Sequence, residues 1–138
     1  MSAYSITTRH KGKMAFEAEI GNHKVIMDTV AGGGGEDSGP PPKKLLLGTL
    51  ATCTGMDVVS LLQKMRVAYS DFDIVTNADL TEEHPKVFSN IEIIYRIKVD
   101  EKDQEKVEKA VTLSQEKYCG ISAMLRKNSP LGYRIEYL

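Results

Sequence analysis

Residues 41–66 read PPKKLLLGTLATCTGMDVVSLLQKMR, and this stretch decides the architecture of the chain. The two prolines favour a helix that begins near Pro42, because proline lacks the amide proton that a first helical turn leaves unpaired in any case. From about Lys43 to Arg66, apolar residues recur at helical spacing and occupy nearly all faces of the helix. A helix of this kind is normally covered on every side. We therefore expect a long, central and mostly buried helix.

The sequence before this helix alternates apolar and polar residues, as half-buried strands do. Strands are expected at residues 4–8, 14–20 and 23–28, with Gly21-Asn22 as a two-residue hairpin turn. Residues 31–39 include four consecutive glycines, and we expect a flexible loop because ordered glycine loses much conformational entropy. A nucleotide-binding loop is disfavoured, since no Walker or GxGxxG pattern surrounds the glycines.

After the central helix, strands are expected at residues 71–81 and 87–99, joined as a hairpin by a polar link. An amphipathic helix then covers about 103–117, and Gly120 interrupts it before a short helix that runs to about residue 127. A last strand covers 132–138. With no repeat and no linker, the order of elements indicates one α+β domain, residues 1–138.

Composition limits the classes of partner. A net charge of −1 argues against nucleic acid, because phosphate binding requires clustered positive charge. No run of 18 or more apolar residues is visible, so we expect no membrane span. The first eleven residues lack the apolar segment of a secretory signal. Two cysteines without a dense disulfide framework fit the cytoplasm, where disulfides are transient.

The two cysteines, Cys53 and Cys119, each lie in an apolar stretch. One interpretation is that both are small buried hydrophobic residues, since free cysteine is among the most buried residue types. The other is that they are reactive, which depends on how well the thiolate is stabilised. Zinc is disfavoured because the three histidines and two cysteines lack ligand spacing. A Cys-His hydrolase is disfavoured because neither cysteine segment contains a histidine.

Three segments in order resemble the OsmC/Ohr family, the osmotically inducible and organic-hydroperoxide-resistance proteins. A Gly-Pro-Pro-Pro turn at residues 39–42 opens the long helix, and Cys-Thr-Gly-Met-Asp-Val-Val follows at residues 53–59. The third segment, residues 113–125, has the pattern Leu-Ser-x-Glu-Lys-Tyr-Cys-x-Ile-Ser-Ala-Met-Leu. The chain is most similar to the small OsmC-like branch of redox proteins. The resemblance spans nearly the whole chain.

The resemblance implies an OsmC-like fold of antiparallel sheets around the central helix, assembled as an intertwined homodimer with two sites at the subunit boundary. It also implies a thiol-dependent peroxidase. Cys53 would be oxidised to a sulfenic acid, Cys119 would resolve it as a Cys53–Cys119 disulfide, and a dithiol reductant would restore both. The apolar surroundings, among them Leu50, Met56 and Ile121, favour an organic hydroperoxide as substrate. No metal or other cofactor is expected.

Activation of Cys53 is the weakest match to the family. Cys53 lies eleven residues after Pro42, beyond the reach of the helix dipole, so a nearby cation must stabilise its thiolate. The resemblance implies an arginine from the N-terminal sheet, for which Arg9 is the candidate, held by a glutamate in the first helical turn. Lys43 and Lys44 stand there instead. The alternative function is therefore a weak or inactive redox-sensing or small-molecule-binding module.

Asp57 lies one helical turn after Cys53. A buried carboxylate needs hydrogen-bond donors or a cation, and a charged one close to a thiol raises the pKa of that thiol. We therefore expect a structural role for Asp57 and not an activating one.

Overall fold

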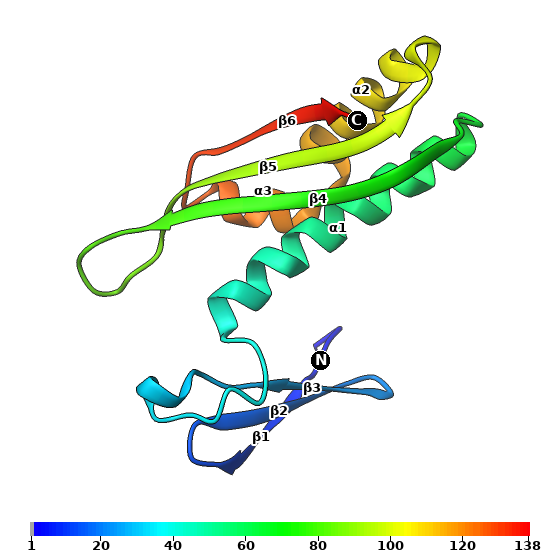
Figure 1. The fold of residues 1–138 in the computed structure, drawn as a ribbon. Helices are drawn as coiled ribbons and strands as arrows, with labels where there is room; N and C mark the ends of the chain where they lie inside the picture. Colours follow the sequence, from blue (N-terminus) through cyan, green and yellow to red (C-terminus); the bar gives the residue numbers. More distant parts are fainter. Residues whose placement is uncertain (1) are drawn as a thin grey trace. The chain divides into compact units, whose positions relative to one another are not determined.

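The computed structural model describes residues 2–138, which form two compact units that meet between Leu46 and Leu47 (Figure 1). The boundary falls inside helix α1 (Pro42–Lys64), so the helix begins in one unit and continues through the other. The single domain expected for residues 1–138 stays a prediction.

The first unit is a three-stranded antiparallel sheet of β1 (Thr7–Gly12), β2 (Ala15–Ile20) and β3 (His23–Met27). The expected two-residue turn at Gly21-Asn22 is confirmed, because Ile20 pairs with His23 across it. The first strand begins at Thr7, so the strand expected at residues 4–8 is placed wrongly. Its true span, residues 7–12, is polar and exposed throughout, which gives it no apolar alternation to recognise.

The glycine-rich loop is organised around the buried carboxylate of Asp28. This carboxylate accepts hydrogen bonds from the backbone amides of Thr29, Glu36 and Ser38 at 2.7–3.1 Å, and from the Ser38 hydroxyl at 2.7 Å. Gly35 packs so closely on the Thr29 carbonyl that a Cβ would collide with it. The flexible loop expected at 31–39 is therefore wrong, since one acidic side chain fixes the segment.

The second unit contains a mixed sheet of β4 (Tyr69–Leu80), β5 (Phe88–Val99) and β6 (Leu131–Tyr137), with β5 in the middle. The expected β4–β5 hairpin is confirmed, but β6 runs parallel to β5, so this sheet is not antiparallel throughout. A parallel neighbour requires a crossover connection, and the helices between β5 and β6 provide it. Alternate residues of β5 supply much of the core: Ile91, Ile93, Tyr95 and Ile97.

Helix α1 buries one line of side chains at intervals of four: Leu50, Thr54, Val58 and Leu62. Gly55 lets the helix approach β4, because a Cβ there would lie 3.1 Å from Ile74 Cδ1. Much of the remaining apolar surface of α1 is not covered within the chain, and only 22% of its most apolar 18-residue window is buried. The expectation of a mostly buried helix is therefore not met by one chain.

One helix bears on the expectation that no segment of the chain spans a membrane. Helix α1 is long and apolar enough to do so by length and composition, with a mean hydropathy of 1.7 over that window. The test is weak evidence, since core helices of soluble proteins pass it as well. Here α1 buries one line of side chains, and Thr54 in that line lies within hydrogen-bond distance of Tyr95 on β5.

Two helices and a wider turn form the crossover from β5 to β6. A short 3₁₀ turn (Glu101–Asp103) leads into α2 (Gln104–Leu113), which continues as a π-helical turn over Ser114–Tyr118. Helix α3 (Gly120–Arg126) follows. The break between them lies at Cys119, whose backbone is extended with φ −76° and ψ 99°, and not at the expected Gly120, which is the first residue of α3.

Candidate functional site

The structure brings Cys53 and Cys119 together as interacting neighbours, although they come from different helical segments. Cys53 is half-buried on α1, and Cys119 is 3% exposed at the junction between the π-helical turn and α3. Both thiols are free. Proximity of this kind is the geometric requirement for a disulfide, because two cysteines with distant backbones cannot be bridged without movement of the chain.

Cys119 occupies the N-cap position of α3 and acts there as a hydrogen-bond acceptor. Its sulfur accepts from the Ser122 amide at 3.4 Å and from the Ser122 hydroxyl at 3.1 Å. The Cys119 amide donates to the Ser114 carbonyl at 2.7 Å, which closes the π-helical turn. Single π turns inside helices are frequent at functional sites. The backbone of Cys119 is thus fixed by the turn before it and its side chain by the helix after it.

Electrostatically, the surroundings of Cys53 favour the protonated thiol. Burial raises the pKa of the Cys53 thiol, the backbone amide of Ile121 lowers it, and the hydrogen bond and charge of Cys119 raise it again. The Asp57 carboxylate acts in the same upward direction, as expected for a nearby negative charge. Among these groups, only the Ile121 amide favours the thiolate, and none of them is a cation.

A buried polar network lies directly beside the two cysteines. The Thr54 hydroxyl is 2.6 Å from the Tyr95 hydroxyl and 2.7 Å from the Ser114 hydroxyl. The Gln115 amide nitrogen donates to Tyr95 at 2.8 Å and to Thr54 at 3.2 Å. All four side chains are buried, at 0–3% exposure. Burial raises the pKa of Tyr95 to about 12, and the hydrogen bonds that Tyr95 makes with Thr54 and Gln115 oppose this shift.

Charged groups close both ends of this network. Ser114 donates to the Asp57 carboxylate at 2.9 Å, and Arg126 donates to the Gln115 side-chain oxygen at 2.9 Å and to its backbone carbonyl at 3.2 Å. The structural role expected for Asp57 agrees with its bond to Ser114. The other members of the network could not be predicted from the sequence, because isolated Thr, Tyr, Ser and Gln residues carry no spacing signal. The nearest clue was that three of them lie in the two cysteine segments.

Arg9, the candidate activating cation, lies on β1 in the first unit and forms an ion pair with Glu19 of β2, at 2.7 Å between Nη1 and Oε1. The first helical turn offers Arg9 no carboxylate, as the sequence indicates, but the neighbouring strand β2 does. Both side chains remain about half exposed. Lys43 and Lys44 are exposed in the first turn of α1, as ordinary solvated charges are.

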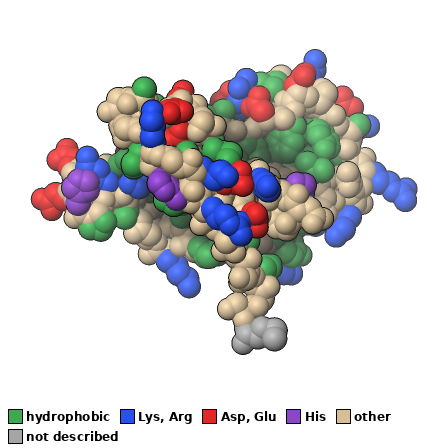
Figure 2. All heavy atoms as spheres, turned by 90° about the horizontal axis from the view of Figure 1, so that it is seen from below, with side chains coloured by type: hydrophobic (Ala, Val, Ile, Leu, Met, Phe, Trp, Pro, Cys, Tyr) green, Lys and Arg blue, Asp and Glu red, His purple; other side chains and the backbone are tan. Residues whose placement is uncertain are grey.

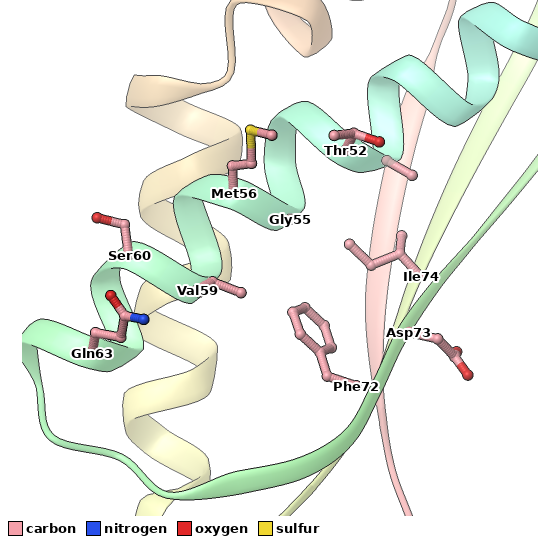
Figure 3. A pocket seen from close by; sticks show the side chains of 10 residues that line it. Thr52, Gly55, Met56, Val59, Ser60, Gln63, Phe72, Asp73 and Ile74 are labelled. Atoms are coloured by element: carbon pink, nitrogen blue, oxygen red, sulfur yellow. The ribbon is translucent and has the colours of Figure 1, made fainter.

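The expected substrate-contacting residues occupy different environments. Leu50 is fully buried and belongs to the core, so it does not present a surface to a substrate. Ile121 is half-buried, and its amide bonds Cys53. Met56 is 68% exposed and lines an apolar groove of about 510 Å³ between α1 and β4, in which Phe72 and Ile74 point toward the helix (Figure 3). Cys53 is not among the residues that line the groove.

Residues 2–138 contain no cluster of three or more His, Cys, Asp or Glu side chains that could hold a metal ion.

Comparison with known proteins gives one consistent family. The sequence profile of the OsmC-like proteins matches residues 34–134. Protein YhfA of Escherichia coli K12 is 33% identical over 105 residues, which are 76% of this chain and 75% of YhfA. A hypothetical protein from Aquifex aeolicus has a similar structure, with a TM-score of 0.80, 28% identity, and 100% and 99% of the two chains covered.

A further solved structure of similar fold is that of an organic hydroperoxide resistance protein OsmC from Legionella pneumophila, with a TM-score of 0.67, 18% identity and 99% of each chain covered. At this identity the likeness concerns the fold alone.

Proposed function

Because the chain belongs to the OsmC-like family and its two cysteines lie together, we propose that it is a thiol-dependent peroxidase that reduces organic hydroperoxides. Family membership supports a redox role. The observation that carries the finer proposal is the adjacency of Cys53 and Cys119, since a sulfenic acid formed on one thiol can condense with a second thiol beside it.

The proposed cycle has three balanced steps. The Cys53 thiolate attacks the terminal oxygen of a hydroperoxide, the O–O bond breaks, and the alkoxide leaves and takes a proton to become an alcohol. The Cys119 thiol then attacks the Cys53 sulfenic acid, which forms the Cys53–Cys119 disulfide and releases water. A dithiol reductant finally reduces this disulfide by exchange and is itself oxidised to a disulfide.

Activation of Cys53 requires a cation from outside the second unit, because the groups that act on it there mostly favour the neutral thiol. We assign this role to Arg9, which Glu19 holds on the sheet of the first unit. A guanidinium held by a carboxylate is better oriented than a free one. Arg9→Met is expected to slow the first oxidation of Cys53 by at least tenfold, and Glu19→Gln by less, because the positive charge remains.

A homodimer is part of this proposal. Helix α1 leaves most of its apolar window uncovered within one chain, and the groove that it forms with β4 is open. Figure 2 shows further apolar side chains at the surface among charged ones, and the first sheet exposes Met14, Phe16 and Ile20 by 42–52%. A second copy of the chain would cover such surfaces. Light scattering should give about twice the 15.3 kDa of the chain, and a value near 15.3 kDa would reject the dimer.

Substrate preference follows from the elements that carry the thiols. The exposed side chains of Met56 on α1 and Met124 on α3 are both apolar. They suit the alkyl part of an organic hydroperoxide better than hydrogen peroxide, which is small and polar. A cytoplasmic location fits the transient disulfide that the cycle requires.

The deciding experiment treats the reduced protein with one equivalent of tert-butyl hydroperoxide and counts free thiols by mass spectrometry. Wild type should lose both thiols and gain a Cys53–Cys119 disulfide. Cys119→Ser should consume about one equivalent and stop, while Cys53→Ser should consume none. If wild type keeps both thiols, the peroxidase proposal fails. If only Cys53→Ser remains reactive, the roles of the two cysteines are reversed.

The second candidate is a redox-sensing or small-molecule-binding module with slow turnover. The raised pKa of Cys53 favours it, because a protonated thiol reacts slowly with peroxide. Steady-state turnover with excess dithiol separates the two candidates: a sensor forms the disulfide once, whereas a peroxidase continues to consume hydroperoxide.

A further inference from the structure

The hydrogen bonds beside the cysteines can be given a direction by counting protons. Arginine only donates, so the Gln115 atom that faces Arg126 is the oxygen, and the Gln115 nitrogen faces Tyr95 and Thr54. At the other end, the Ser114 hydroxyl donates its one proton to the Asp57 carboxylate. The orientation of both ends is therefore fixed.

The middle of the network follows from these ends. Because the Ser114 proton is used, the 2.7 Å contact with Thr54 requires Thr54 to donate. The Thr54 proton is then used as well, so the 2.6 Å contact requires Tyr95 to donate to Thr54. One continuous chain results, in which each member donates to the next: Arg126, Gln115, Tyr95, Thr54, Ser114 and Asp57.

This chain connects the two segments that carry the thiols. Thr54 and Asp57 lie on α1 immediately after Cys53, while Ser114 and Gln115 lie in the π-helical turn that ends at Cys119. The connection continues through the main chain, because the Ser114 carbonyl accepts the Cys119 amide at 2.7 Å. Arg126 adds a bond from α3, the helix that Cys119 caps. The backbone of Cys119 is thus tied through Ser114 to the helix that carries Cys53, and α3 is tied to the same chain through Arg126.

We propose that this hydrogen-bond chain is a positioning device that holds Cys119 against Cys53, and that Thr54, Ser114, Gln115 and Arg126 are positioning residues for the disulfide between them. The inference rests on the proposed function only in that it takes the Cys53–Cys119 disulfide from the proposed catalytic cycle. A single-direction chain with a cation at one end and a carboxylate at the other is cooperatively polarised. Loss of one hydroxyl therefore loosens the whole chain and not a single contact.

The test measures the disulfide without peroxide. Reduced protein is equilibrated with mixtures of oxidised and reduced dithiothreitol: the two protein thiols lose two electrons and two protons, and oxidised dithiothreitol takes them up. The equilibrium constant is then read from trapped thiols by mass spectrometry. A substitution that destabilises the oxidised and reduced folds equally leaves this constant unchanged, so the assay responds to positioning and not to stability alone.

Thr54→Val keeps the shape of the side chain and removes its hydroxyl, and Ser114→Ala interrupts the same chain from the other segment. We expect each to lower the equilibrium constant at least tenfold, equivalent to about 30 mV for a two-electron couple. Thr54→Ser restores the hydroxyl and should return the constant to within threefold of wild type. Thr112→Val is the matched control, because the Thr112 hydroxyl has no hydrogen-bond partner within residues 2–138.

A second measurement uses only the reduced protein. The rate at which iodoacetamide alkylates Cys119, which is 3% exposed in the wild type, should rise at least fivefold in Thr54→Val and remain unchanged in Thr112→Val. If a core variant does not fold, Arg126→Gln replaces it in both measurements, because Arg126 lies at the exposed end of the hydrogen-bond chain. Arg126→Gln should lower the equilibrium constant and raise the alkylation rate of Cys119, each by at least threefold.

Three results would overturn the inference: chain variants within twofold of wild type in both measurements, a Thr112→Val effect as large as theirs, or a wild type that forms no disulfide with dithiothreitol. A different result rejects the peroxidase proposal alone. In that case the disulfide forms with oxidised dithiothreitol and responds to the chain variants, but tert-butyl hydroperoxide does not produce it.

Discussion

Tyr95→Phe should remove a loss of stability at alkaline pH that the wild type shows. The Tyr95 hydroxyl is buried, and burial raises its pKa to about 12 from the ordinary value of about 10. A group whose pKa is raised in the folded state contributes stability that is fully present below the unfolded pKa. This contribution is lost as the pH rises from about 10 through about 12, because the unfolded chain releases the proton first.

The size of the effect follows from these two pKa values. Between them the folded state holds one more proton than the unfolded state, so the free energy of unfolding falls by about 1.4 kcal/mol per pH unit. Integration from pH 9 to pH 11 gives a loss of about 1.3 kcal/mol that is due to Tyr95. At pH 7, Tyr95→Phe should itself destabilise the fold by about 1 kcal/mol, since Thr54 and Gln115 each lose a hydrogen bond.

Urea unfolding at pH 9 and pH 11, followed by far-ultraviolet circular dichroism, provides the assay. The wild type should lose about 1.3 kcal/mol more than Tyr95→Phe over this interval. Tyr118→Phe serves as control, because Tyr118 is 50% exposed. If wild type and Tyr95→Phe lose the same stability between pH 9 and pH 11, within about 0.3 kcal/mol, the Tyr95 phenol does not stay protonated in the fold. The assignment of protons along the network is then wrong.

Three further outcomes are expected. Gly35→Ala should destabilise the fold strongly, because its Cβ would meet the Thr29 carbonyl, whereas Gly32→Ala points into open space and should be tolerated; thermal unfolding compares them. Hydrogen bonds hold the pKa of the Asp28 carboxyl well below its usual range. The wild type therefore has this stabilisation above the unfolded pKa and loses it as the pH falls, whereas Asp28→Asn should show a smaller loss of stability in acid. Urea unfolding at pH values from 5 to 3 compares the two proteins. Leu62→Ala should cost about 2–5 kcal/mol in urea unfolding, since Leu62 is fully buried on α1.

The sequence predicts those elements whose pattern is local. Apolar alternation locates β5, helical spacing locates α1, and Gly21-Asn22 fixes the first hairpin, because each signal depends only on neighbouring residues. The position of the first strand could not be predicted, because residues 7–12 are all exposed and therefore lack a periodic apolar face. The parallel pairing of β6 with β5 could not be predicted either, because the tertiary fold, and not the sequence of one strand, determines which strands pair.

The candidate site divides in the same way. The two cysteine segments are recognisable by their motifs, and the structure places them side by side. The network behind them could not be read from sequence, because Tyr95 contributes to it from a strand that looks like ordinary core. Asp28 shows the same limit: one carboxylate orders a glycine-rich segment whose composition alone indicates disorder.

The reaction has two requirements: Cys119 must lie against Cys53, and the Cys53 thiolate must be stabilised. The second unit meets the first requirement and opposes the second. The hydrogen-bond chain from Arg126 to Asp57 secures the position of Cys119, but its negative end, Asp57, raises the pKa of Cys53. The arrangement that favours disulfide formation therefore disfavours the thiolate that must react first. The proposed activation by Arg9 would resolve the conflict, because a cation that is not part of this unit could stabilise the Cys53 thiolate without changing the position of Cys119. Substitution of Arg9 should then alter the first oxidation alone, and substitution of Thr54 the disulfide alone.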